Sequence, residues 1–191
     1  MPQQPDSIGR LFLAESRATF ASQKELAERA IAQLSDEQVR QPLDHNTNSI
    51  AVIMKHMAGN MLSRWSDFLT SDGEKPWRDR DREFIDDFAD RAAVMDYWQR
   101  GWSCLFNTLD ALAPGDLEQT VHIRGEPHSV IKAINRQLSH YGYHVGQIML
   151  IARVLAKEKW NVLTIPRGQS QQFNHKVWMG EPPSEDAQRP Q

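Results

Sequence analysis

The sequence predicts an all-α protein built on a bundle of four long helices. Two observations carry this prediction. Apolar residues recur at helical spacing in four long blocks, and the polar–apolar alternation of a half-buried strand is nearly absent. Residues that start or stop helices separate the blocks, so each block is expected to form one helix of the bundle.

The first two helices are expected at residues 7–34 and about 50–68. Pro42 prevents any extension of the first helix, and a run of cap-forming residues at 46–49 precedes the second. The segment 74–86 that follows is polar. Its run 75–83 mixes charges of both signs closely, so we expect this run to be a solvated loop.

The other two helices are expected at residues 86–112 and 128–157. Between them, residues 118–127 are expected to form a short hairpin, because β-favouring residues flank a glycine-containing turn. Beyond residue 161 the helical pattern fades.

A single domain is expected from the length of 191 residues, since domains commonly contain roughly 100–200 residues. We assign residues 1–180 to this domain. Residues 181–191 are rich in proline and polar residues and are expected to be a disordered C-terminal tail.

Composition excludes several functional classes. The formal net charge of −3 is not that of a strongly basic nucleic-acid-binding protein. No apolar stretch reaches the ~20 residues of a membrane span, and no apolar core of a secretory signal follows Met1. The single cysteine, Cys104, cannot form an internal disulfide. We therefore expect a cytoplasmic protein without nucleic-acid or membrane partners.

Two of the seven histidines, His140 and His144, stand four residues apart in the last expected helix. Such a pair lies only about 40° apart around the helix and about 6 Å apart along it, so both imidazoles can bind one metal ion. Seven histidines in 191 residues give about 0.2 such pairs by chance, so the spacing alone is weak evidence.

A helical wheel adds to this evidence. With His140 at 0°, the apolar stripe of its helix falls between about 60° and 160°, and His144 lies at about 40°, on the flank of the stripe. His56 occupies the same flank position beside the stripe of the second expected helix. Packing of the two stripes can bring the flanks together. Partly exposed histidines without a ligand role are the open alternative.

The order of His56 followed by the His140/His144 pair resembles the ligand pattern of the DinB/YfiT-like superfamily. Segments 53–60 and 140–148 carry this match. Three further segments resemble an uncharacterised branch of that superfamily, namely 65–77, 123–126 and 165–170. The resemblance extends from about residue 8 to residue 175.

The resemblance implies an up-down-down-up four-helix bundle, frequently dimeric, in which His56, His140 and His144 bind a divalent ion such as nickel or zinc. Characterised members of the superfamily include thiol-dependent transferases and isomerases. The resemblance leaves the substrate open. We expect a metal-dependent enzyme acting on a small molecule, either a transferase or isomerase that uses a low-molecular-weight thiol as cosubstrate, or a hydrolase. Neutral imidazole suits these ions, and three protein ligands leave a position open for water or substrate.

Four other residues are candidates for substrate binding. Asn60 and Gln147 lie within about one turn of the expected ligands and can fix an imidazole tautomer or bond to a substrate. Arg64 and Arg136 can clamp an anionic substrate, although surface ion pairs are their more ordinary role. The competing function is a non-catalytic helical bundle, a binding or stress-related scaffold whose histidines are incidental or hold a structural ion.

A homodimer is predicted from the third expected helix together with the resemblance. With Trp98 at 0°, Trp102 falls at about 40° and Tyr97 at about −100°, a wider apolar surface than the ~100° stripe that one bundle helix needs. The second contact is expected against the C-terminal segment (Phe173, Trp178) or another subunit, and the resemblance favours a symmetric dimer. Light scattering at micromolar concentration is expected to give twice the chain mass. A mass near 22.0 kDa would contradict the dimer.

Overall fold

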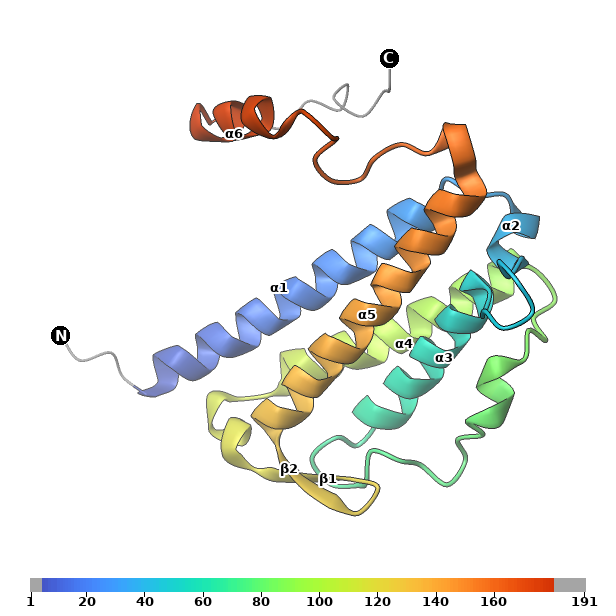
Figure 1. Ribbon diagram of the computed structural model, residues 1–191. Helices are drawn as coiled ribbons and strands as arrows, with labels where there is room; N and C mark the ends of the chain where they lie inside the picture. The colour runs from blue at the N-terminus through green and yellow to red at the C-terminus, as the bar shows by residue number, and fades with distance from the viewer. Residues whose placement is uncertain (1–4, 181–191) are drawn as a thin grey trace.

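The computed structural model describes residues 5–180, which are mainly helical with one two-stranded sheet (Figure 1). The four long helices are α1 (Pro5–Ile31), α3 (Ile50–Trp65), α4 (Arg91–Ala111) and α5 (Val130–Ala156). Shorter segments are α2 (Asp36–Arg40), α6 (Ser170–Trp178) and the 3₁₀ turns η1 (Asp81–Phe84), η2 (Pro114–Glu118) and η3 (Lys157–Lys159). The prediction of a mainly helical chain is confirmed, and no described helix is long and apolar enough to cross a membrane.

Side-chain caps determine where the long helices begin. Ser49 accepts a hydrogen bond from the backbone N–H of Val52 at the start of α3, and Ser129 caps α5 in the same way. Asp90 caps α4, so this helix begins later than the residue 86 expected from its apolar pattern. The first helix, expected to reach residue 34, ends at Ile31, and Ser35 starts the separate short helix α2 with a capping box.

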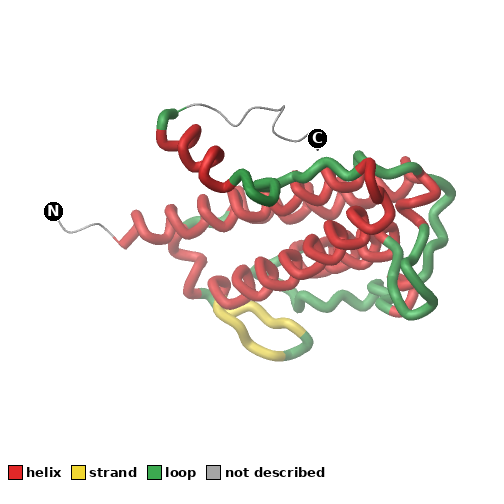
Figure 2. Tube along the Cα trace, turned by 45° about the horizontal axis from the view of Figure 1, so that its top comes forward, coloured by secondary structure: helices red, strands yellow, loops and turns green. Residues whose placement is uncertain are grey.

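The long helices run in two directions. Arg91 at the start of α4 donates to the backbone oxygen of Leu34 just after α1, at 2.7 Å, so α1 and α4 are antiparallel. Thr108 near the end of α4 donates to the backbone oxygen of Trp65 at the end of α3, at 2.8 Å, so α3 and α4 are parallel. Figure 2 shows these helices side by side along their lengths.

The end of α5 lies beside the segment that follows α1, where Gln38 donates to the backbone oxygen of Leu155 at 2.8 Å. Helices α1 and α5 are therefore parallel to each other and pack together, while α3 packs against both α4 and α5. Because α3 and α4 are parallel neighbours, residues 66–90 must return along the length of the molecule (Figure 1). This connection, which includes η1, contacts α3 on its way.

One aromatic ring from each long helix meets in the middle of the core. Phe20 of α1 lies 6.2 Å from Trp65 of α3, 6.5 Å from Trp102 of α4 and 5.7 Å from Tyr141 of α5, measured between ring centroids. All four side chains are fully buried. These tilted and edge-on contacts add to the apolar burial that holds the helices together.

The aromatic surface of α4 is covered mostly from within the chain. Trp98 and Trp102 are fully buried, and Tyr97 packs against Phe88 of the connection with a centroid distance of 5.9 Å. Of the two alternatives for the second contact, the C-terminal segment does not provide it, because Trp178 is 81% exposed on α6, which stands apart from the long helices (Figure 1). The wide apolar surface of α4 is therefore no longer an argument for a second subunit, and the homodimer stays a prediction from the resemblance.

The C-terminal part of the chain differs from the expectation in a second way. The helix α6 lies where the apolar pattern fades, and none of its residues is buried. It therefore has no buried apolar stripe from which it could have been predicted. The predicted tail at residues 181–191 lies outside the described residues.

The predicted hairpin is confirmed. Strands β1 (Thr120–Ile123) and β2 (Glu126–Ser129) pair antiparallel across Arg124 and Gly125, whose φ angles of 57° and 76° are those of a tight two-residue turn. The carboxylate of Asp72 accepts hydrogen bonds from both turn N–H groups, at 2.9 and 2.7 Å. The hairpin is therefore attached to the connection that follows α3.

The close approach of α3 and α4 depends on Gly101. A Cβ atom at this position would lie 2.8 Å from the Cα of Ala58, a backbone atom that cannot move alone. We expect Gly101→Ala to lower the free energy of unfolding by about 1–3 kcal/mol. Gly146→Ala on α5 is the matched control, because no atom lies within 4 Å of its added Cβ. The control is expected to stabilise by about 0.5–1 kcal/mol through helix propensity, and urea unfolding measures both. Equal stabilisation by the two substitutions would contradict the close packing.

Candidate metal centre

Three histidines from two helices meet between α3 and α5. Each of His56, His140 and His144 offers one ring nitrogen, and these three atoms lie within 4.8 Å of one another. The ring centroids of His56 and His144 are 5.0 Å apart, and those of His140 and His144 are 4.8 Å apart. The predicted meeting of the two helix flanks is confirmed.

Each of the three imidazoles has an oxygen acceptor at its Nδ1 atom. The Nδ1–O distances are 2.9 Å from His56 to Glu83, 3.3 Å from His140 to Gln137 and 2.8 Å from His144 to Gln147. Carboxylate and amide oxygens only accept hydrogen bonds, so each Nδ1 donates and the lone pair remains on Nε2. This is the arrangement of histidines that bind metal ions through Nε2.

The Nε2 atom of His144 is buried and has no hydrogen-bond partner among the described residues. A buried acceptor without a partner costs free energy, and such exceptions call for an explanation such as an absent ion. A cation shared with the two neighbouring imidazoles satisfies this atom. The residues present therefore fit a bound metal ion.

The environment of the site keeps the imidazoles neutral. Burial lowers the pKa of His140 to about 3, and the neighbouring His144 and His56 lower it as well. Burial likewise lowers the pKa of His144 to about 4, with a smaller contribution from His56. Neutral imidazole is the form that binds a metal ion, so no proton has to leave these two side chains at neutral pH.

A buried carboxylate from η1 holds His56 in place. Glu83 lies against α3 opposite Gly59, where an added Cβ would sit 2.9 Å from the Glu83 carboxyl carbon. Arg78 donates two hydrogen bonds to the same carboxylate, at 2.8 and 2.9 Å. Burial opposes the charge, but the bonds from His56 and Arg78 bring the pKa of Glu83 below its usual value. Glu83 is therefore an ionised acceptor for the His56 N–H.

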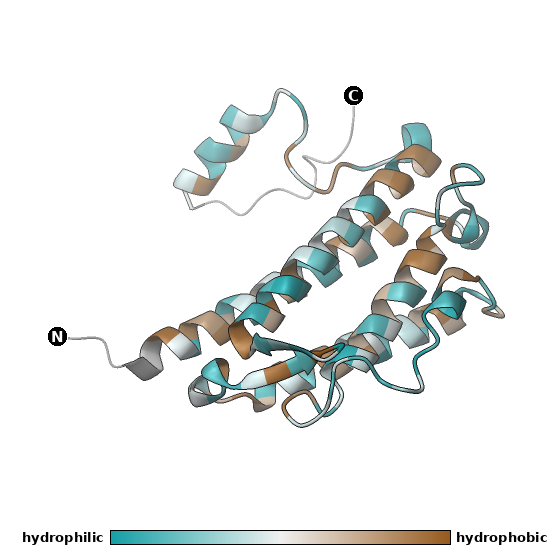
Figure 3. Ribbon diagram, turned by 60° about the horizontal axis from the view of Figure 1, so that its bottom comes forward, coloured by the Kyte–Doolittle hydropathy of each residue, from teal (hydrophilic) through white to brown (hydrophobic). Residues whose placement is uncertain are grey.

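This contact corrects part of one expectation. The run 75–83 is expected to be a solvated loop, and the segment 74–86 that contains it is largely hydrophilic (Figure 3). Most residues of the run are exposed, as expected. Lys75 and Glu83 are buried, however, and the side chain of Arg78 is only 2% exposed. Ion pairing and hydrogen bonding allow these three polar side chains to be buried, which composition alone does not predict.

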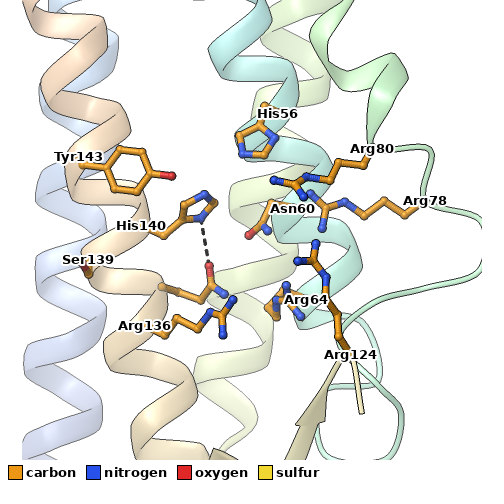
Figure 4. Close-up of a pocket in the computed structure, with 11 residues that line it drawn as sticks. His56, Asn60, Arg64, Arg78, Arg80, Arg124, Arg136, Ser139, His140 and Tyr143 are labelled. Atoms are coloured by element: carbon orange, nitrogen blue, oxygen red, sulfur yellow. Dashed lines mark hydrogen bonds between the residues drawn. The ribbon is translucent and has the colours of Figure 1, made fainter. Parts of the chain in front are cut away.

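A cavity of about 320 Å³ opens beside His56 and His140 (Figure 4). Helices α3 and α5 form two of its sides, and the connection and the hairpin turn approach from a third. Its lining residues are His56, Asn60, Arg64, Arg78, Arg80, Arg124, Arg136, Gln137, Ser139, His140 and Tyr143. Five of them are arginines, so the cavity is strongly cationic.

Three of the four candidate substrate-binding residues line this cavity: Asn60, Arg64 and Arg136. Gln147 does not line it and instead accepts the hydrogen bond from His144. Several side chains of the site were not predicted from the sequence, namely Arg78, Arg80, Glu83, Arg124, Gln137 and Tyr143. The role of Gln137 could have been predicted from its spacing. It lies three residues before His140, just as Gln147 lies three residues after His144, and residues three apart are neighbours on a helix.

The comparisons with known proteins give a family but no activity. A family model described as "Protein of unknown function (DUF1572)" matches residues 7–169, which is most of the chain. No curated protein matches the chain.

Stability of the metal-free protein is expected to depend on the site histidines. Between pH 6.5 and about 4, unfolded His144 binds a proton that the folded side chain does not. The free energy of unfolding therefore falls as pH drops through this range, by up to about 1.4 kcal/mol per pH unit for one such group. Denaturant unfolding of chelator-treated protein is expected to show a shallower slope for His144→Gln than for the wild type.

The control for this experiment is His175→Gln, which removes an exposed histidine on α6. It is expected to leave the slope as in the wild type. A slope that is the same for the His144→Gln variant and the wild type would show that this imidazole is not held neutral.

Proposed function

The chain belongs to the DUF1572 family, and we propose that it is a divalent-metal-dependent enzyme whose ion is bound by His56, His140 and His144. One observation carries the proposal. The Nε2 atom of His144 is buried without a hydrogen-bond partner among the described residues, in a set of three ring nitrogens within 4.8 Å of one another.

Nickel and zinc are the ions that we propose, because the resemblance to the DinB/YfiT-like superfamily implies them and both accept neutral imidazole ligands. Three protein ligands leave coordination positions free, which is typical of catalytic rather than structural sites. When bound, such an ion supplies Lewis acidity that lowers the pKa of a coordinated water or thiol.

The chain's own residues orient the ligands. Glu83, Gln137 and Gln147 each accept one Nδ1–H, which fixes the tautomer and rotation of each ring. The charged carboxylate of Glu83 also makes His56 a stronger base, and hence a stronger ligand. The cavity beside His56 and His140 gives a small substrate access to the same place.

The arrangement of the helices supports the resemblance to the DinB/YfiT-like superfamily. Helices α1 and α5 run one way and α3 and α4 the other, which corresponds to the up-down-down-up order that the resemblance implies. We therefore propose a DinB/YfiT-like four-helix bundle, and on the resemblance we propose that it forms a homodimer. The reaction proposed is a transfer or isomerisation with a low-molecular-weight thiol, or a hydrolysis.

Cys104 is not the thiol in this proposal. It does not line the cavity, its nearest polar partner is the Ser66 hydroxyl at 3.6 Å, and burial raises the pKa of its thiol. A raised pKa leaves little reactive thiolate at neutral pH. The nucleophile is therefore expected to be water or a separate thiol.

Metal analysis of protein purified without chelator tests the proposal. We expect nearly one equivalent of nickel or zinc in the wild type, and its loss in His56→Ala and His144→Ala, because each variant removes one of three ligands. Gln147→Leu removes only the acceptor of His144 and is expected to weaken metal binding by about 10–100-fold.

The control His45→Ala removes an exposed histidine outside the centre and is expected to retain the metal. Folded wild-type protein that takes up neither ion at neutral pH would refute the proposal and favour a non-catalytic scaffold. Metal-loaded protein is then screened against electrophiles with and without added thiol, which separates transfer from hydrolysis.

A further inference from the structure

Arg64 is a buried cation whose donors are largely unused. Its residue is 3% exposed, and its Nε and Nη1 atoms have no hydrogen-bond partner among the described residues. The nearest carboxylate oxygen, from Glu74, is 3.9 Å from Nη2, which is too long for a hydrogen bond. Burial lowers the pKa of Arg64 to about 10, so the side chain is still charged at neutral pH.

A buried guanidinium without partners is costly, because the charge has lost its water and gained little in return. The cost is explained if the cavity that Arg64 lines accepts an anion. Figure 4 shows the guanidinium groups of Arg64, Arg124 and Arg136 turned toward this cavity from α3, the hairpin turn and α5.

The carboxylates nearby do not neutralise the cluster. Glu83 is occupied by Arg78 and His56. Glu74 is shared between Arg124 at 3.1 Å, Arg78 at 3.4 Å and the more distant Arg64. The Asp72 carboxylate is bonded to the backbone N–H groups of the hairpin turn, and the charge of Arg64 helps to lower its pKa. Five guanidinium groups line the cavity against these three carboxylates, so a cationic excess remains.

Asn60 adds a neutral donor. Its Oδ1 atom accepts a hydrogen bond from the Tyr141 hydroxyl at 3.0 Å, and that hydroxyl in turn accepts one from the Trp65 indole at 3.2 Å. The amide orientation is therefore fixed, and Asn60 offers its NH₂ group to the cavity that it lines.

Gly73 leaves the space that Arg64 occupies. A Cβ atom at position 73 would lie 2.6 Å from Nη1 and 2.8 Å from Cδ of Arg64. Gly73 is itself held by a hydrogen bond of 2.8 Å from its backbone N–H to the oxygen of His122. The hairpin and the connection thus place Arg64 as well as Arg124.

We infer that Arg64, Arg124, Arg136 and Asn60 form a binding site for a compact oxyanion with two negative charges, a phosphate group or a dicarboxylate. Guanidinium groups recognise both through paired hydrogen bonds. The role of this anion as part of the substrate rests on the proposed function. Binding of the anion does not require the metal ion.

Calorimetric titration of full-length, chelator-treated protein at low ionic strength tests the inference, with inorganic phosphate and succinate as separate probes. We expect saturable binding of at least one probe at a single site, and the tighter probe identifies the oxyanion. Arg64→Met and Arg136→Gln are each expected to weaken binding by about tenfold or more. Gly73→Ala keeps every charge and is expected to weaken binding by displacing Arg64.

Arg153→Gln is the matched control, since it removes one positive charge from an exposed position of α5 outside the cavity. It is expected to change the affinity less than twofold. Circular dichroism checks that each variant is folded. Because Arg136 is exposed, its replacement is expected to leave the fold intact, and Arg136→Gln therefore still tests the inference if Arg64→Met unfolds. Absence of binding by both probes, or equal loss in Arg136→Gln and Arg153→Gln, would overturn the inference.

His144→Ala separates this inference from the proposed function. The variant is expected to lose the metal and still bind the anion. Anion binding that disappears with His144 and returns only with added metal would overturn an arginine site and leave the metal centre as the place of binding.

Discussion

The buried contact of Glu83 with His56 and Arg78 is the interaction on which the rest of the site depends. It attaches the long connection to α3 beside His56 and Gly59. A buried carboxylate is stable only with such partners, and removing one partner of a buried ion pair is strongly destabilising. The contact therefore fixes both the path of the connection and the orientation of His56. It also brings Arg78 to the cavity.

Much of the helical framework could be predicted from the sequence because its causes are local. Apolar periodicity and cap residues such as Ser49 and Ser129 act within a few positions of the chain, and they locate α3 and α5 to within a few residues. The flank position of His56 and of the His140/His144 pair was visible on a helical wheel for the same reason. Helix packing then needed only to bring two known faces together.

The path of residues 66–90 could not be predicted, because it follows from the parallel directions of α3 and α4 and not from any local pattern. The connection carries Arg78, Arg80 and Glu83, so the approach of these three side chains to the site could not be predicted from local patterns. Arg64 illustrates the same limit. Its place on α3 was clear, but its burial depends on the distant Gly73, which a sequence pattern does not pair with it.

The candidate metal centre and the arginine cluster are electrostatically dependent on each other. Arg64 and Arg78 contribute to the low pKa of His140, after burial and the other two histidines, so the cationic cavity favours the neutral imidazole that a metal ion needs. A divalent cation placed beside five guanidinium groups would nevertheless raise the local positive charge further. An anion in the cavity offsets both charges. If both proposals hold, metal and anion each increase the affinity of the site for the other, and thermodynamic linkage requires that this effect be reciprocal.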